Sequence, residues 1–132
     1  MCEVFHVHRS RLGQIIIDCQ VTDLDNAADF WSSALGYECR HLKDPADAHY
    51  RQLITEEGQL CILLQAVNHP SRVHLDIEST DVEAEVQRLE ALGARRVQQI
   101  RTWWIMEAPT GHRFCVVRRQ RPGLEEHGHQ WQ

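Results

Sequence analysis

The chain has 132 residues, of which 42% are hydrophobic and 25% are charged, enough for a single domain with a hydrophobic core. Its net charge of −5 excludes a surface built for nucleic acid, because phosphate binding depends on clustered Lys and Arg. No stretch reaches the roughly 18 apolar residues of a membrane helix, and the first residues lack the apolar core of a signal peptide. A cytoplasmic protein that does not bind membranes is therefore expected.

The first half of the chain predicts a strand, a helix and three further strands. Thr22 or Asp23 can cap the helix, and its apolar residues recur at helical spacing up to Gly36, which ends it. Phe30 and Trp31 lie on this apolar stripe and are expected in the core. The predicted strands cover residues 14–21, about 37–43, 49–55 and 59–67.

The second half repeats this order of elements. A strand over 73–78 precedes a helix that ends at Gly93. Val86, Leu89 and Leu92 are expected on the inner face of that helix. The strands that follow are "ARRVQQI", "TWWIMEA" and "HRFCVVRR".

Alignment of the two halves indicates an internal repeat. When "IIIDCQVTDLDNAADFWSSALGYE" is set beside "VHLDIESTDVEAEVQRLEALGARR", Asp18 meets Asp76 at an offset of 58 residues. The chain is thus predicted to be one domain, 1–132, made of two modules. The modules cover about 14–67 and 72–119, and the ends, 1–12 and 120–132, are predicted to be flexible.

The repeated units resemble the vicinal oxygen chelate superfamily, which includes glyoxalase I, extradiol dioxygenases and bleomycin-resistance proteins. The resemblance covers about residues 14–119 and is closest to small glyoxalase-like proteins. It rests on "TDLDNAADFWSSALGYE", "VHLDIESTDVEAEVQRLEALGA" and the ending "APTGHRFCVV". It implies an α+β fold in which two tandem βαβββ modules form a curled, mixed half-barrel sheet around a cleft.

The resemblance also implies where a metal would bind. Metal-dependent members supply four ligands, one from the first and one from the last strand of each module. Carried over by position, these places fall on Ile16, about Ile62, His74 and Cys115. Only two of the four can ligate a metal, so no cofactor is expected and a divalent metal is disfavoured.

The strand "RVHLDIES" has one titratable face. Alternation places His74, Asp76 and Glu78 on the same side, and the repeat adds Asp18 and Gln20 from the first module. His74 with Asp18 or Asp76 could act as general acid and base, enolising a carbonyl compound or opening an epoxide. Glu78 and Gln20 would then contact the ligand.

Other interpretations of these residues remain open. Asp18 and Asp76 could instead accept hydrogen bonds that join the modules, with Arg72 and Arg113 as available donors. Cys115 is expected to point toward the cleft, as a ligand contact, a nucleophile activated by His74 or a simple buried thiol.

The aromatic residues predict a ligand surface. Trp103 and Trp104 are adjacent on one strand, so one faces each side. One is expected in the core, and the other could stack with Tyr50 on a flat ligand while Ile16 lines the pocket. Two functions follow: a protein that binds a small organic or aromatic compound without the four-ligand metal site, or a lyase- or isomerase-type enzyme. A homodimer is the expected assembly, because half-barrel edges are otherwise exposed.

Overall fold

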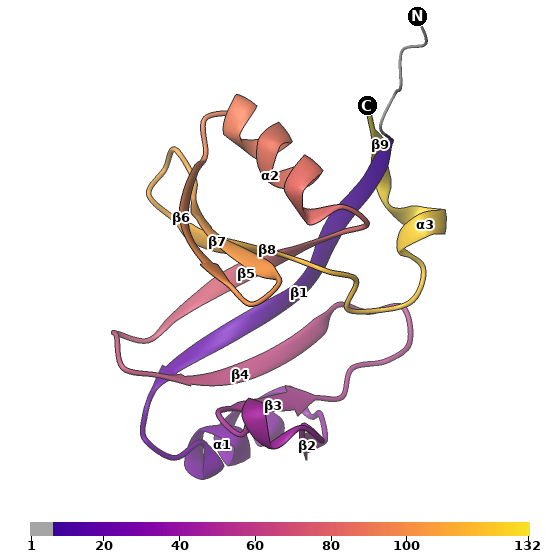
Figure 1. Cartoon of the computed structure of the whole chain (residues 1–132). Helices are drawn as coiled ribbons and strands as arrows, with labels where there is room; N and C mark the ends of the chain where they lie inside the picture. Colours follow the sequence, from indigo (N-terminus) through magenta and orange to yellow (C-terminus); the bar gives the residue numbers. More distant parts are fainter. Residues whose placement is uncertain (1–6) are drawn as a thin grey trace, which may run out of the picture. The chain divides into compact units, whose positions relative to one another are not determined.

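The computed structural model describes residues 7–132 and divides into two compact units (Figure 1). One unit is Gln14–His74, and the other combines Leu75–Gln132 with residues 7–13. Strands β1 (His8–Gln20) and β5 (Arg72–Ser79) contribute residues to both units. The described residues include no helix that is long and apolar enough to cross a membrane.

The Gln14–His74 unit contains the first βαβββ module. Its four strands follow the order β2-β3-β4-β1, in which β1 runs parallel to β4 and the other pairs are antiparallel. After β1 its elements are α1 (Asp25–Leu35), β2 (Cys39–His41), the 3₁₀ helix η1 (Pro45–Asp47), β3 (Tyr50–Leu53) and β4 (Cys61–Val67).

One face of this sheet packs against α1. The buried core there consists of Cys19, Leu24, Ala28, Leu53 and Leu64. Ile17 also packs against this core. Because successive side chains of a strand point to opposite faces, Asp18 and its even-numbered neighbours lie on the face away from α1.

Helix α1 begins and ends near the residues that the sequence predicts. The N-cap residue is Leu24, which makes no side-chain cap hydrogen bond, rather than the predicted Thr22 or Asp23. The Asp23 carboxylate accepts a hydrogen bond of 2.8 Å from the backbone N–H of Asp25, and Gly36 ends the helix with a φ of 77°. The prediction that Phe30 is a core residue is wrong, because its side chain is 61% exposed. Trp31 packs on the core instead, and Phe30 lies about 100° further round the helix.

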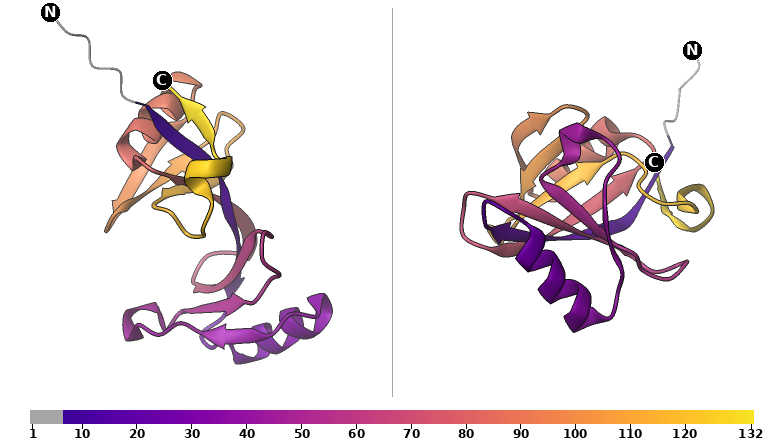
Figure 2. Two further views of the ribbon diagram at one scale, coloured as in Figure 1. Left: turned by 90° about the vertical axis from the view of Figure 1, so that its right-hand side faces the viewer. Right: turned by 90° about the horizontal axis from the view of Figure 1, so that it is seen from below.

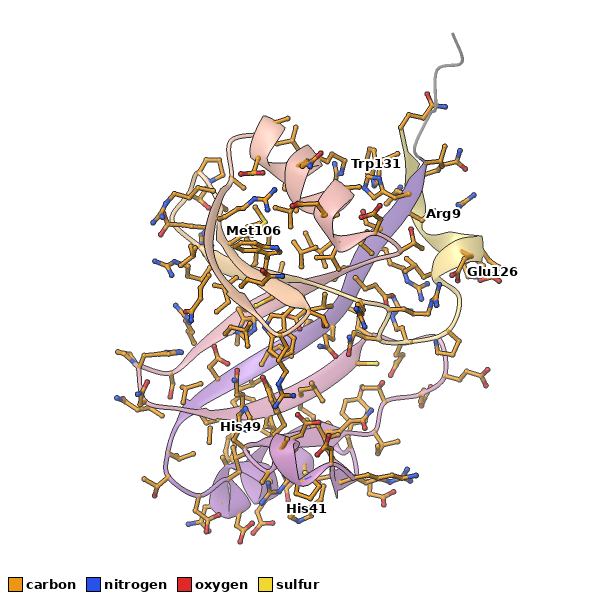
Figure 3. The ribbon with its side chains drawn as sticks, viewed as in Figure 1. Arg9, His41, His49, Met106, Glu126 and Trp131 are labelled. Carbon is orange, nitrogen blue, oxygen red and sulfur yellow. The ribbon has the colours of Figure 1, made fainter. Side chains whose placement is uncertain are left out.

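The Leu75–Gln132 unit contains the second module. After β5 its elements are α2 (Val82–Ala91), β6 (Arg95–Ile100), β7 (Trp103–Glu107) and β8 (Arg113–Val117), and the strand order is β5-β8-β7-β6. Helix α2 packs along one face of these strands and covers Met106 (Figures 2 and 3). The Asp81 carboxylate caps α2 by accepting from the Ala84 N–H. Leu92 was expected on the inner face, but it is 67% exposed, so that prediction is wrong.

The end of the chain has regular structure where the sequence predicts a flexible segment. It forms α3 (Leu124–His127) and β9 (His129–Trp131), and β9 pairs antiparallel with the first residues of β1. The Trp131 indole donates a hydrogen bond of 2.8 Å to the Ser10 hydroxyl, and the Arg88 guanidinium stacks 3.8 Å from its ring centre. Aromatic packing thus fixes β9 in place.

A buried carboxylate on α2 joins this contact to β1. Glu85 accepts hydrogen bonds of 2.8 Å from His8 and from two nitrogens of Arg88. Burial alone would raise the pKa of Glu85, but hydrogen bonds from Arg88, His8 and Ser10 lower it below the ordinary value. Glu85 is therefore ionised and stabilises the folded unit.

Candidate functional site

Asp18 and His74 form a hydrogen-bonded pair in the Gln14–His74 unit. His74 Nδ1 lies 2.8 Å from Asp18 Oδ2, and the side chains are 12% and 1% exposed. An ionised carboxylate only accepts, so Nδ1 carries a proton. Asp18 therefore fixes the orientation of the His74 imidazole.

Two further side chains gather on the same carboxylate oxygen. Arg72 Nε lies 3.5 Å from Asp18 Oδ2, and His69 Nε2 lies 4.0 Å from it. The other oxygen, Asp18 Oδ1, is buried and accepts no hydrogen bond from residues 7–132. Arg72 thus contacts Asp18, as one open interpretation of the sequence anticipated, and His69 was not anticipated at all.

His69 has a defined tautomer. Its Nδ1 lies 2.9 Å from the carbonyl oxygen of Pro70, which can only accept, so Nδ1 carries the proton. Its Nε2 then accepts from Arg72 Nη2 at 3.5 Å. His69 belongs to the connection "NHPS" between the modules. The shortness of this connection is the signal from which a contact between His69 and β1 could have been predicted.

The Leu75–Gln132 unit presents Asp76 and Cys115 as a pair. They occupy directly paired positions on the parallel strands β5 and β8. Ile77 and Phe114 pack on the α2 core, so alternation turns Asp76 and Cys115 to the other face. The orientation of Cys115 away from the helix agrees with the sequence pattern.

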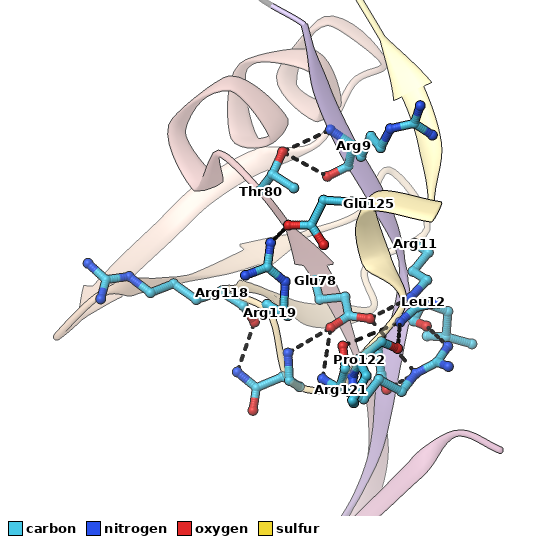
Figure 4. A network of polar contacts seen from close by, with 12 residues as sticks. Arg9, Arg11, Leu12, Glu78, Thr80, Arg118, Arg119, Arg121, Pro122 and Glu125 are labelled. Carbon is cyan, nitrogen blue, oxygen red and sulfur yellow. Dashed lines mark hydrogen bonds and ion pairs between the residues drawn. The ribbon is translucent and has the colours of Figure 1, made fainter. Parts of the chain in front are cut away.

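Glu78 is fully buried in a network with two arginines (Figure 4). Its Oε2 accepts from Arg11 Nε at 2.6 Å and lies 3.8 Å from Arg121 Nε, while Oε1 accepts from the Gln120 N–H at 2.7 Å. A Cβ on Gly13 would come within 2.9 Å of the Glu78 side chain, so β1 passes close to Glu78 at this glycine. These contacts connect β1 to the chain end, whereas the sequence predicts a ligand contact for Glu78.

Two other predicted ligand contacts bond to the protein itself. The Gln20 side chain donates to the carbonyl of Asn68 at 3.3 Å, and its backbone N–H donates to Ser71. The Tyr50 hydroxyl accepts from Gln65 at 3.1 Å, and its ring lies 4.2 Å from that of His49. A ligand role for Gln20 and Tyr50 stays a prediction.

The two adjacent tryptophans point to opposite faces, as the sequence predicts. Trp104 packs against the α2 core, below the guanidinium of Arg96, which lies 5.0 Å from the ring centre. Trp103 is therefore the one of the pair on the face that Asp76 shares. Ile16 is 2% exposed and pairs with Leu63 on the face of β1 that carries Asp18.

A groove of about 380 Å³ runs beside α1 within the Gln14–His74 unit. Ile17, Ala27 and Trp31 supply apolar walls, and Val73 lines it from the start of β5. This volume falls in the range of small-molecule pockets, about 300–1,000 Å³. The groove has the chemistry of a site for an apolar or aromatic compound.

A family model described as a glyoxalase-like domain matches residues 14–117. The chain belongs to this family. No curated protein matches this glyoxalase-like chain.

Solved structures have the same fold as this glyoxalase-like chain. A methylmalonyl-CoA epimerase from Mycobacterium tuberculosis aligns with a TM-score of 0.61 and 20% identity, over 83% of this chain and 88% of that one. A methylmalonyl-CoA epimerase in complex with methylmalonyl-CoA and NH4+ gives 0.60 and 18%, over 84% and 95%. A hypothetical protein from Bacillus halodurans C-125 gives 0.61 and 15%, over 85% and 96%. Because these identities are 20% or less, the similarity shows only the α+β fold of βαβββ modules.

Apolar residues occupy two of the four metal-ligand positions that the glyoxalase-like resemblance implies. Ile62 packs on the α1 core, so the position opposite Ile16 falls on Leu63 rather than on Ile62. Neither Ile16 nor Leu63 can ligate a metal, and the four-ligand set does not fit. On β5 and β8, His74, Asp76 and Cys115 still offer imidazole, carboxylate and thiol donors and form a candidate metal-binding group.

Proposed function

We propose that this chain binds a small oxygenated organic compound over the polar face of β5 and moves a proton on it, with His74 as the base. The observation that carries the proposal is the 2.8 Å contact between His74 Nδ1 and Asp18 Oδ2. It orients the imidazole and places a carboxylate where it can stabilise the imidazolium that forms when the ring takes a proton. This is a lyase- or isomerase-type activity that needs no four-ligand metal site.

Asp18 supports this role through its charge. When Nε2 takes a proton, the imidazolium forms beside a carboxylate that is 1% exposed, where water screens the attraction weakly. Arg72 moderates the effect, since its guanidinium also lies against Oδ2. A positioned base of this kind typically contributes about 10²–10⁴-fold to a rate.

The similar structures support the reaction class. Several are named as methylmalonyl-CoA epimerases, and inverting a carbon next to a carbonyl removes and returns a proton. At 20% identity or less this likeness is an argument for proton transfer, and it does not identify the substrate.

The test is proton exchange in D₂O, followed by ¹H NMR on a panel of small carbonyl compounds. A compound that binds in the reactive orientation loses its C–H signal in the presence of the protein. His74→Gln is expected to reduce the exchange rate about 10²–10⁴-fold, and Asp18→Asn about 10–100-fold.

His41→Gln is the matched control, since His41 is an exposed histidine on β2 (Figure 3). Its exchange rate should equal that of the unsubstituted chain. Exchange that survives His74→Gln unchanged would show that another group is the base.

Binding without turnover is the second function, and the groove beside α1 favours it. The groove is lined mainly by apolar side chains and by Trp31, whose fluorescence would report an occupant. Under this function an aromatic compound quenches tryptophan emission to saturation, Trp31→Leu reduces the change, and no C–H exchange occurs.

A further inference from the structure

Arg72 and His74 share one face of β5 and one hydrogen-bonding partner. They are two residues apart on the strand, so their side chains project to the same side. Both donate to Asp18 Oδ2, Arg72 from Nε at 3.5 Å and His74 from Nδ1 at 2.8 Å. A permanent cation therefore stands beside the proposed base.

Arg72 has N–H groups that donate no hydrogen bond within the described residues. A guanidinium carries five N–H groups, but Arg72 uses only Nε, toward Asp18, and Nη2, toward His69. Both contacts measure 3.5 Å, at the long end of hydrogen bonding. In the part of the chain that the structure describes, Nη1 donates no hydrogen bond.

Exposure and charge favour an anion on the open side of Arg72. Its side chain is 46% exposed, whereas the Asp18 side chain that it contacts is 1% exposed. An incoming anion would thus meet the guanidinium before the buried carboxylate. A planar guanidinium fits a carboxylate through two parallel hydrogen bonds.

We propose that Arg72 binds a carboxylate of the substrate, so that the substrates are small organic acids with a carbonyl beside the carboxylate. His69 is a positioning residue, because its Nε2 accepts from Arg72 while Pro70 fixes its tautomer. This inference rests on the proposed function of His74 and names the substrate class for it.

The experiment compares 2-oxobutyrate with its neutral methyl ester, which keeps the carbonyl and lacks the charge. Each is titrated into the full chain while ¹H–¹⁵N NMR follows the Nε–H signal of Arg72. The acid should bind about tenfold or more tightly than the ester. Arg72→Gln should abolish this preference, and Arg72→Lys should keep part of it because a point charge remains.

Arg40→Gln is the matched control, since Arg40 is a 58% exposed arginine paired with Glu38 in the same unit. It should leave the preference for the acid unchanged. His69→Ala should weaken acid binding with little effect on the ester, as expected for a residue that acts through Arg72.

Three results would overturn the inference. These are no preference for the acid in the unsubstituted chain, full preference in Arg72→Gln, or inorganic phosphate competing as well as 2-oxobutyrate. The role of His74 is judged separately: acid binding that depends on Arg72 with C–H exchange that ignores His74→Gln retains the carboxylate site and rejects the base.

Discussion

Gln20 and Glu78 occupy matching places in the two repeats, yet their surroundings differ completely. Gln20 is exposed and bonds to the connection between the modules at Asn68. Glu78 is fully buried between Arg11 and the chain end. The repeat determines which face of the strand a residue occupies, and the segments that flank each module determine what it contacts there.

The same contrast separates Asp18 from Asp76. Asp18 accepts hydrogen bonds from His74 and Arg72, which belong to the start of β5. Asp76 is paired in register with Cys115 of β8. Two residues that the sequence treats as equivalent therefore differ in their surroundings, with Arg72 beside Asp18 and Cys115 beside Asp76.

The largest expected effect comes from breaking the Glu78 network. Glu78→Ala leaves Arg11 and Arg121 without their carboxylate, and removing one partner of a buried ion pair costs about 3–5 kcal/mol of unfolding free energy. Urea denaturation followed by circular dichroism measures this loss.

Gln20→Ala is the matched change in the first module. It removes one exposed hydrogen bond and should alter the unfolding free energy by no more than about 0.5 kcal/mol. Equal losses in the two variants would contradict the contrast between the repeats.

A smaller effect, with a defined pH dependence, is expected at Glu85. Hydrogen bonds from Arg88, His8 and Ser10 outweigh burial and lower its pKa, so its contribution is complete above the unfolded value of 4.5 and is lost as the pH falls through the folded value. Glu85→Gln should cost about 1–3 kcal/mol at pH 7 and flatten the fall in stability below about pH 4.5. Urea midpoints from pH 3 to 7 test this, and an unchanged acid limb would contradict it.

The modules could be predicted from sequence because their signals are local. Alternation in β1 and β5 and the glycines that end the two helices, Gly36 and Gly93, each act within a few residues. The chain end could not be predicted, because β9 has three residues and its pairing with β1 spans more than a hundred residues of sequence. Trp131, an aromatic residue in a polar tail, was the available clue.

For the candidate site, too, the local pattern could be predicted and the contacts between distant residues could not. Alternation grouped Asp18, His74 and Asp76 on one kind of face, and strand register agrees with it. The role of His69 depends on how a four-residue connection folds, and Glu78 bonds to Arg11 from 67 residues away. Neither contact has a periodic signal in the sequence.

Helix α2 offers a further comparison, between two leucines three residues apart on its predicted apolar stripe. Leu89 is 9% exposed and Leu92 is 67% exposed, although both fit the apolar stripe. Leu89→Ala should cost about 2–5 kcal/mol, whereas Leu92→Ala should change the unfolding free energy by about 0.5 kcal/mol or less. A large loss at Leu92 would mean that a partner covers it in solution, which sedimentation analysis would detect.

The smallest measured value is expected for the content of bound divalent metal. The first module supplies Ile16 and Leu63 at two of the positions implied by the family, so the full chain without a His tag should hold well below one equivalent of divalent metal. Elemental analysis measures this, with His127→Gln/His129→Gln removing the exposed histidines near the chain end. The full chain is required because residues 124–131 form part of the folded unit.

Cys115→Ala shows whether the donors of the second module bind a metal by themselves. If the apolar positions of the first module prevent binding, the variant and the unsubstituted chain have the same low metal content. A full equivalent that disappears in Cys115→Ala would instead mean that imidazole, carboxylate and thiol donors bind a metal without help from the first module. His74 Nε2 would then be a metal ligand, and the proton-transfer role proposed for it would pass to another group.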